Sequence, residues 1–288
     1  MNRLNGSHVL VGFDGSAASE RAVRWAAVEA RLRRLPLTVC HAWHWPYSDS
    51  PSGPAALEVA RKMGAHTLDR GVAIAREVAP GIDVRPRLAE GPASAILVYE
   101  SGNATLALVG VRGQGGFEEL AAGSAAVQLT SYAHCPIVVV RNAADRARPV
   151  VVGVDGSPSS ETALAFAFEE AALHGQTVLA VHGCWEPEAI AAAEMGMIQD
   201  PDHLRVTGGA RLERAVAPWR EKYPHVEAET RLVMLTPRHA LLEAATGAGL
   251  LVLGNRGLGG VAGMRLGSVS HAMLLQAPCS VAIVPATA

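Results

Sequence analysis

The sequence lacks the features that mark nucleic-acid-binding, membrane-spanning or secreted chains. Its charges nearly balance, with 25 Lys and Arg against 27 Asp and Glu in 288 residues, so no basic field favours nucleic acid. Its apolar runs, such as 105–109 and 250–253, are far too short to span a bilayer. No signal-peptide core precedes the first strand-like run. We therefore expect a soluble, cytoplasmic protein that has neither nucleic acid nor membrane as a partner.

Cysteine is scarce, and no two cysteines have the spacing of a CxxC or zinc motif. A disulfide framework would be unusual in a large, well-cored chain, and 49% hydrophobic against 18% charged residues allows a sizeable core. Buried structural thiols are the simple interpretation, a redox role is the alternative, and no metal site is expected. The four cysteines are Cys40, Cys135, Cys184 and Cys279.

The chain repeats itself. Residues 9–26 and 150–167 share ten identities in eighteen positions, including Val-Gly-x-Asp-Gly-Ser in both. A second pair of motifs begins at Gly110 and Gly254. Two tandem copies of one domain explain this pattern. We expect domains at 1–143 and 148–288, joined by a polar, proline-ended linker.

Each half alternates apolar strand-like runs with amphipathic helical segments, which predicts a doubly wound parallel sheet in each domain. Ser16 and Ser157 suit helix N-caps, and Pro158 suits a first helical position. Ligands of such sheets bind beyond the carboxyl ends of the strands. In the first half, strands are expected at 9–13, 37–42, 82–88, 105–109 and 137–140, with helices after Ser16, near 55–78, after Pro92 and at 124–133.

Two glycine-rich loops follow the fourth predicted strands, and both have the form Gly-x2-Gly-x9-Gly-Ser before a helix. Glycines let the backbone approach a ligand and expose N–H groups, and a helix start favours phosphate. Neither loop is a Walker A or Rossmann sequence. The simple alternative is that the glycines only allow tight turns.

An aspartate lies at the tip of the first strand in each half, Asp14 and Asp155. A carboxylate there is able to accept a hydrogen bond from a ribose hydroxyl or an adenine amino group. The alternative is a turn or capping residue.

The pairing of Val-Gly-x-Asp-Gly-Ser with Gly-x2-Gly-x9-Gly-Ser resembles the ATP-binding class of universal stress proteins, in the tandem-domain form found in actinobacteria. The resemblance implies a five-stranded parallel sheet in each domain and one ATP per domain, with Mg²⁺. It also implies pairing of domains or subunits through 137–140 and 281–284, so that a homodimer is expected. A role in stress adaptation, dormancy or growth control, through an unknown protein partner, is implied as well.

The resemblance also transfers binding roles to matching positions. The acids at the adenosine end match Asp14 and Asp155, and Ala42 and Gly183, each 28 residues further on, match a backbone contact to adenine. The remaining expected nucleotide-binding positions are Gly12, Gly110, Arg112, Gly113, Gly115, Gly116, Gly123, Ser124 and Ala125 in the first domain, and Gly153, Gly254, Arg256, Gly257, Gly259, Gly260, Gly267, Ser268, Val269 and Ser270 in the second.

Three functions compete: a nucleotide-binding regulator, a slow ATP hydrolase and a dimerisation scaffold with vestigial loops. An enzyme needs a positioned base and usually a metal-ligand set, and no catalytic residue is assigned. His41 and His182 recur beside the expected pocket as candidate bases, or as structural residues that end a buried strand. The loop 43–54 is a candidate adenine cover, a partner surface or simple domain packing; its aromatic residues are Trp43, Trp45 and Tyr47.

The two loops differ in charge. Loop alignment sets Glu118 and Glu119 against Ala262 and Gly263, and Ala121 against Arg265. Two acids repel a triphosphate unless a metal intervenes, whereas an arginine attracts it. The alternative is that the side chains of Glu118, Glu119 and Arg265 point to solvent.

We predict that the C-terminal site binds ATP more tightly than the N-terminal site. Titration of the Asp14→Ala and Asp155→Ala variants isolates the two sites, and the Asp14→Ala protein is expected to bind ATP with the higher affinity. Equal affinities in the two variants would contradict the asymmetry.

Overall fold

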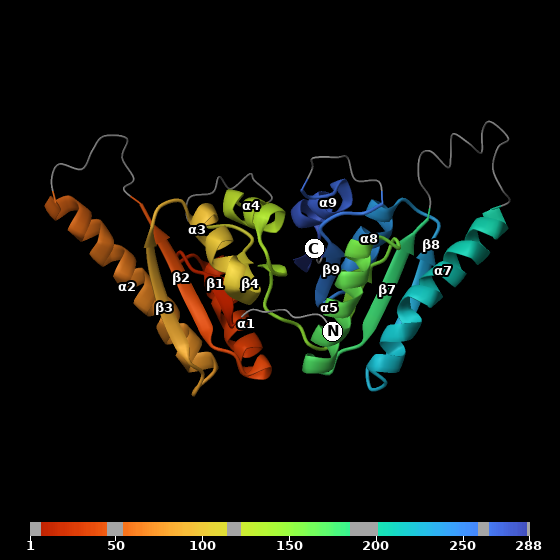
Figure 1. The fold of residues 1–288 in the computed structure, drawn as a ribbon, viewed down its shortest axis with the longest axis horizontal. Coiled ribbons are helices and arrows are strands. Elements are labelled where there is room, and N and C mark those ends of the chain that lie inside the picture. Colours follow the sequence, from red (N-terminus) through yellow and green to blue (C-terminus); the bar gives the residue numbers. More distant parts are fainter. Residues whose placement is uncertain (1–6, 45–53, 114–121, 185–200, 259–264, 287–288) are drawn as a thin grey trace. The chain divides into compact units, whose positions relative to one another are not determined.

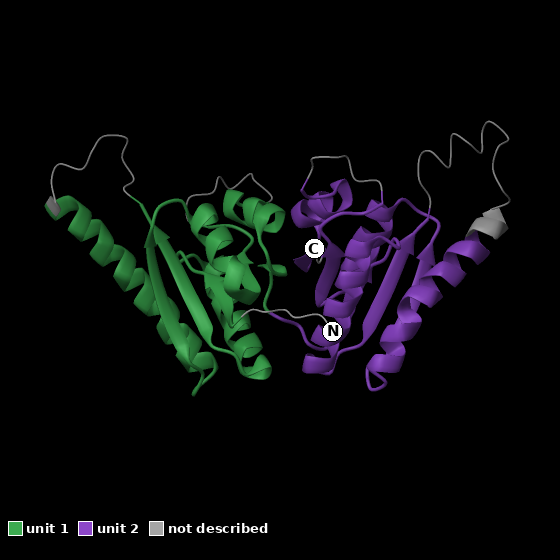
Figure 2. Ribbon diagram, viewed as in Figure 1, with its two compact units in different colours: residues 1–143 green, residues 144–288 purple. Residues whose placement is uncertain are grey.

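The computed structural model describes residues 7–44, 54–113, 122–184, 201–258 and 265–286, and the chain divides into two compact units, Met1–Ala143 and Ala144–Ala288 (Figure 2). Each unit contains a five-stranded parallel sheet with helices on both faces. The predicted fold class, two tandem doubly wound α/β domains, is confirmed.

Unit 1 has the strand order β3-β2-β1-β4-β5, and each neighbouring pair is parallel. The switch point of this sheet lies between β1 and β4, where the strand order reverses. Its elements are β1 (His8–Gly12), α1 (Ala17–Arg33), β2 (Leu37–Trp43), α2 (Pro54–Val78), β3 (Val84–Glu90), α3 (Ala93–Glu100), a 3-10 turn (Ser101–Asn103), β4 (Ala104–Gly110), α4 (Ser124–Tyr132) and β5 (Ile137–Val140).

Unit 2 repeats this arrangement with the order β10-β9-β6-β7-β8, again parallel throughout. Its switch point lies between β6 and β9. Its elements are β6 (Val150–Gly153), α5 (Pro158–His174), β7 (Val178–Gly183), α7 (Pro201–Lys222), β8 (Ala228–Val233), α8 (Pro237–Ala245), β9 (Leu250–Gly254), α9 (Ser268–Gln276) and β10 (Ser280–Val284).

The first helix of each unit begins at the predicted cap. The Ser16 hydroxyl accepts the Ser19 N–H at 3.2 Å, and the Ser157 hydroxyl accepts the Ser160 N–H at 3.2 Å. Pro158 occupies the first turn of α5, where its missing N–H costs nothing. Both N-cap predictions are confirmed.

Helices cover both faces of each sheet, so the strands are buried on both sides. In unit 1, α1 packs against α2 and α3 packs against α4; in unit 2, α5 packs against α7 and α8 against α9 (Figure 1). The central strands β1 and β4 are accordingly apolar and almost wholly inaccessible to water. No helix in the described part of the chain is long and apolar enough to cross a membrane.

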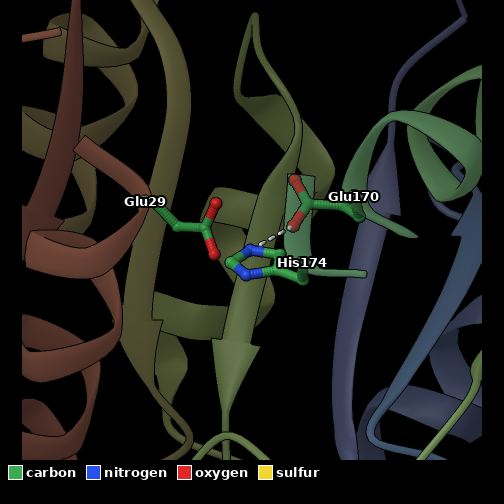
Figure 3. Close-up of side chains that lie close together, drawn as sticks. All are labelled: Glu29, Glu170 and His174. Atoms are coloured by element: carbon green, nitrogen blue, oxygen red, sulfur yellow. Dashed lines mark ion pairs between the residues drawn. The ribbon is translucent and has the colours of Figure 1, made fainter. Parts of the chain in front are cut away.

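Each first helix also carries a buried glutamate at an equivalent position, Glu29 in α1 and Glu170 in α5 (Figure 3). The Trp25 indole N–H donates to Glu29 at 2.9 Å, and Arg33 Nε lies 3.5 Å from the same carboxylate. In α5, His174 Nε2 lies 3.6 Å from Glu170. Burying a carboxylate without polar neighbours costs folding free energy, and these contacts reduce that cost.

His8 distinguishes unit 1 from unit 2. It lies at the start of β1 with only 8% of its surface exposed, whereas Pro149 precedes β6 at the corresponding place. Its Nδ1 lies 3.3 Å from the Ser7 hydroxyl, and its Nε2 has no hydrogen-bond partner within the described residues. Burial lowers the pKa of His8 below its ordinary value; Glu100 opposes this shift and Arg85 reinforces it.

We predict that acid weakens unit 1 through His8. Because its pKa is lowered on folding, the unfolded chain takes up the proton first; the stabilising contribution is complete at neutral pH and is lost as the pH falls below about 6.5. Hydrogen-exchange protection of β1 in the wild type is therefore expected to fall more between pH 7.5 and 5.5 than in a His8→Asn variant. The same pH dependence in both proteins would exclude His8 as the cause.

Candidate functional site

The first-strand aspartates lie where sequence reasoning placed them, in the turns after β1 and β6. Asp14 Oδ1 accepts the Ser16 N–H at 3.0 Å, and Asp155 Oδ1 accepts the Ser157 N–H at 2.9 Å. The glycine between the aspartate and the serine has a positive φ in both units, +86° at Gly15. Each aspartate is therefore held in a tight turn that leads directly into a helix.

Each aspartate also contacts the glycine-rich loop that follows the neighbouring strand. Asp155 Oδ2 accepts the Leu258 N–H at 3.0 Å and lies 2.5 Å from where a Cβ would stand on Gly257. Asp14 lies equally tightly against Gly113. The structure thus brings together, in both units, the two motifs that the sequence places about 100 residues apart.

The serine after each aspartate strengthens this junction. The Ser16 hydroxyl donates to the Arg112 carbonyl and the Ser157 hydroxyl to the Arg256 carbonyl, both at 3.4 Å. Sequence reasoning recognised these serines only as helix caps. Their second contact depends on the loop conformation, for which the sequence offers no signal.

Asp155 is held as a carboxylate. Burial raises its pKa, but hydrogen bonds from Ser157, Leu258 and Ser160 outweigh burial and leave the pKa below its ordinary value. An ionised carboxylate accepts only, and its two oxygens offer about four lone-pair positions in all. Two of these positions are taken by backbone donors, the Ser157 N–H on Oδ1 and the Leu258 N–H on Oδ2.

The glycines of the loops are required by the protein's own packing. A Cβ on Gly254 would lie 2.7 Å from the Ser159 backbone, and one on Gly110 would lie 2.7 Å from the Ala18 backbone. These glycines let β9 and β4 reach the first turns of α5 and α1. Glycine was expected because of a ligand, but the close approach that the structure shows is to a helix.

The strand-end glycines Gly12 and Gly153 serve packing in the same way. A Cβ on Gly12 would lie 2.9 Å from Leu97, and one on Gly153 would lie 2.6 Å from Leu253. Their contacts are with leucine side chains of the core.

The helices that follow the loops begin without a side-chain cap. Gly123 and Gly267 are the N-caps of α4 and α9, with extended backbone (φ −74° and −68°). Ser124, Ala125, Ser268 and Val269 form the first turns, whose N–H groups have no partner inside the helix. Such a terminus has the donors and the dipole that suit an anion.

Unit 2 has one further hydroxyl in this first turn. The Ser270 side chain donates to the Gly254 carbonyl at 2.7 Å, and Ala126 occupies the matching place in unit 1. Ser270 was expected to bind nucleotide, whereas its observed contact ties α9 to the end of β9.

The two histidines end buried strands and bind backbone. His41 Nδ1 lies 2.7 Å from the Phe13 carbonyl, and His182 Nδ1 lies 2.6 Å from the Val154 carbonyl. A carbonyl only accepts, so Nδ1 carries the proton. Each imidazole therefore fixes the residue before the site aspartate, which agrees with the structural alternative for these histidines.

The expected adenine positions lie at the ends of the second strands of the two sheets. Ala42 is half-buried on β2, and Gly183 is buried at the end of β7. A Cβ on Gly183 would lie 2.7 Å from the Pro237 backbone and 3.0 Å from the Leu235 carbonyl. The segment after β8 therefore covers Gly183 in unit 2.

Part of the predicted site lies outside the described residues. This part comprises Gly115, Gly116, Glu118, Glu119, Ala121, Gly259, Gly260, Ala262 and Gly263, together with Trp45 in the loop after β2.

Sequence reasoning missed two arginines beside the aspartate turns. Arg70 of α2 donates to the Gly15 carbonyl at 2.5 Å and to Glu20 at 2.8 Å. Arg211 of α7 lies against Gly156, whose Cβ would stand 2.8 Å from Nη2. The two arginines are not equivalent in the repeat, because Arg70 aligns with Arg214 and Arg211 aligns with Thr67.

The family model, two sequence relatives and one solved structure that match this chain are all universal stress proteins. The Universal stress protein family model matches residues 7–141 and again residues 146–285. A universal stress protein of Mycolicibacterium smegmatis is 34% identical over 287 residues, covering 96% of each chain. Universal stress protein Rv2623 of Mycobacterium tuberculosis is 34% identical, covering 95% of each chain. The crystal structure of a universal stress protein from Archaeoglobus fulgidus has the same fold, with a TM-score of 0.71 at 17% identity, and covers 99% of this chain and 98% of its own.

We predict that Gly254→Ala destabilises unit 2 by roughly 1–3 kcal/mol, because the added methyl meets backbone that cannot move aside. Gly247→Ala is the matched control, since nothing lies within 4 Å of its Cβ position. Chemical denaturation of the two variants measures the difference. Equal stabilities would show that the β9–α5 contact relaxes easily.

Proposed function

The chain belongs to the universal stress protein family, and from this membership and the site geometry we propose that each domain, 1–143 and 148–288, binds one ATP. We further propose that the bound nucleotide regulates a protein response in stress adaptation, dormancy or growth control. The observation that carries the proposal is the double occurrence of one arrangement: a strand-end aspartate joined to a loop that enters an uncapped helix.

The uncapped helix starts fit a phosphate chain. Gly123 and Gly267 bring no side chain to the N-termini of α4 and α9, so the free N–H groups of each first turn have room for phosphate oxygens. A serine follows each glycine and adds a hydroxyl at the same end of the helix.

The aspartates fit the nucleoside. Asp155 is ionised and accepts the Ser157 and Leu258 N–H groups, and its remaining lone pairs suit a ribose hydroxyl or the adenine amino group. In this proposal the aspartate has two tasks. It holds the turn and the loop together, and it orients the ligand between them.

The free energy of nucleotide binding is large enough to regulate which form of the protein a partner meets. A ligand at a hundredfold excess over its Kd stabilises the form that binds it by about 2.7 kcal/mol. A partner that distinguishes the nucleotide-bound form from the free form would thereby respond to the ATP concentration.

The direct test is nucleotide extraction. Protein purified without added nucleotide is denatured, and the supernatant is separated by ion-exchange chromatography. We expect up to two adenine nucleotides per chain, and a rise in Tm when Mg-ATP is added to nucleotide-free protein. Extracted ADP in place of ATP would redirect the proposal to slow hydrolysis.

Substitution at the helix start gives the control. Gly267→Val places a branched side chain where the phosphate is expected. Its Cβ lies at ordinary contact distances, 3.5 Å from the Arg256 and Asn255 backbone and 3.6 Å from the Gly257 N. This variant is expected to lose the nucleotide of unit 2, so that at most one nucleotide per chain remains. No nucleotide and no thermal shift in the wild type would overturn the proposal and favour a scaffold.

A further inference from the structure

Both units have an arginine at the aspartate turn, but the two arginines come from different positions on the long helix. The sequences of the long helices α2 and α7 align with an offset of 144 residues. This alignment pairs buried residues with buried residues, Leu68 with Leu212 and Val72 with Val216. In this register Arg211 corresponds to Thr67, one helical turn before Arg70. The two aligned helices therefore have different side chains at this equivalent position, Thr67 in unit 1 and Arg211 in unit 2.

The guanidinium of Arg211 lies over the turn itself. A Cβ on Gly156 would be 2.8 Å from Nη2, 2.9 Å from Nε and 3.1 Å from Cζ, so the whole planar group faces the glycine. Gly156 has a φ of +81° and directly follows Asp155. The arginine is thus held within one residue of the carboxylate proposed to orient the nucleotide.

The two units use their arginines differently. In unit 1, Arg70 is paired with Glu20 at 2.8 Å and bonded to the Gly15 carbonyl, so its charge is already balanced. Within the described residues, Arg211 has neither a hydrogen bond nor an ion pair, and its side chain is exposed. Its five N–H donors are therefore available to an anion from solution.

We propose that Arg211 binds the phosphate groups of the nucleotide in unit 2 and makes that site selective for charged nucleotides over the uncharged nucleoside. This inference rests on the proposed nucleotide site. Arginine suits the task because its planar fork binds phosphate through two parallel hydrogen bonds, and because it stays charged at all physiological pH values. Among the described residues of unit 1, the aligned Thr67 is neutral and Arg70 is paired with Glu20.

The test uses the Asp14→Ala protein, in which the C-terminal site is the one measured. Calorimetric titration with ATP and with adenosine compares this parent with the same protein carrying Arg211→Gln. We expect Arg211→Gln to weaken ATP binding about five- to tenfold, with adenosine binding changed less than about twofold. An exposed side chain is removed, so folding is expected to be unchanged and is checked by circular dichroism.

Arg214→Gln is the matched control. Arg214 lies one turn further along α7, is exposed, and bonds the Ala210 carbonyl of its own helix. It removes the same charge from the same helix and is expected to leave ATP binding unchanged.

The outcomes separate the two proposals. ATP binding that is unaffected by Arg211→Gln, or reduced equally by Arg214→Gln, overturns the role of Arg211 while leaving the nucleotide site intact. An equal loss of adenosine and ATP also overturns it, because the arginine then acts through the turn. A parent protein that binds no nucleotide refutes the proposed function itself.

Discussion

The candidate sites depend on the contact between the aspartate turn after the first strand and the glycine loop after the fourth. In unit 2 the Asp155 carboxylate accepts N–H groups from both segments, and the Ser157 hydroxyl adds a bond to the Arg256 carbonyl. These two segments border the switch point of the sheet, where strand order reverses and the connecting helices leave on opposite faces. Without this contact the turn and the loop would be two independent surface segments.

The same contact explains the glycine spacing. Gly254 lets the end of β9 touch the first turn of α5, and Gly257 leaves room for the Asp155 carboxylate. A motif that is easily interpreted as ligand-binding is thus also a packing motif, and a substitution within it changes stability and binding together. Gly267 differs from both, because its Cβ position is open enough for a methyl group.

The two units share one architecture and differ in detail around it. Unit 1 buries His8 and pairs Arg70 with Glu20, whereas unit 2 has Ser270 bonded to Gly254 and leaves Arg211 unpaired among the described residues. Duplicated domains of this kind are free to keep the backbone contacts that the fold needs while the side chains around them diverge. Both aspartate turns have an arginine beside them, but among the described residues only the one in unit 1 is paired, and the proposed selectivity follows from this difference.

The sequence by itself determined the repeat, the α/β class, the helix caps at Ser16 and Ser157, and the strand-end positions of Asp14 and Asp155. These follow from local periodicity, capping chemistry and the rule that parallel strands end at one edge. Only the tertiary structure decided that Gly254 meets Ser159 and that Arg211 lies over Gly156. Both contacts join segments far apart in the chain, and they depend on how each helix is rotated and shifted along its sheet. Side-chain packing over the whole domain sets that rotation and shift, so no local pattern encodes them.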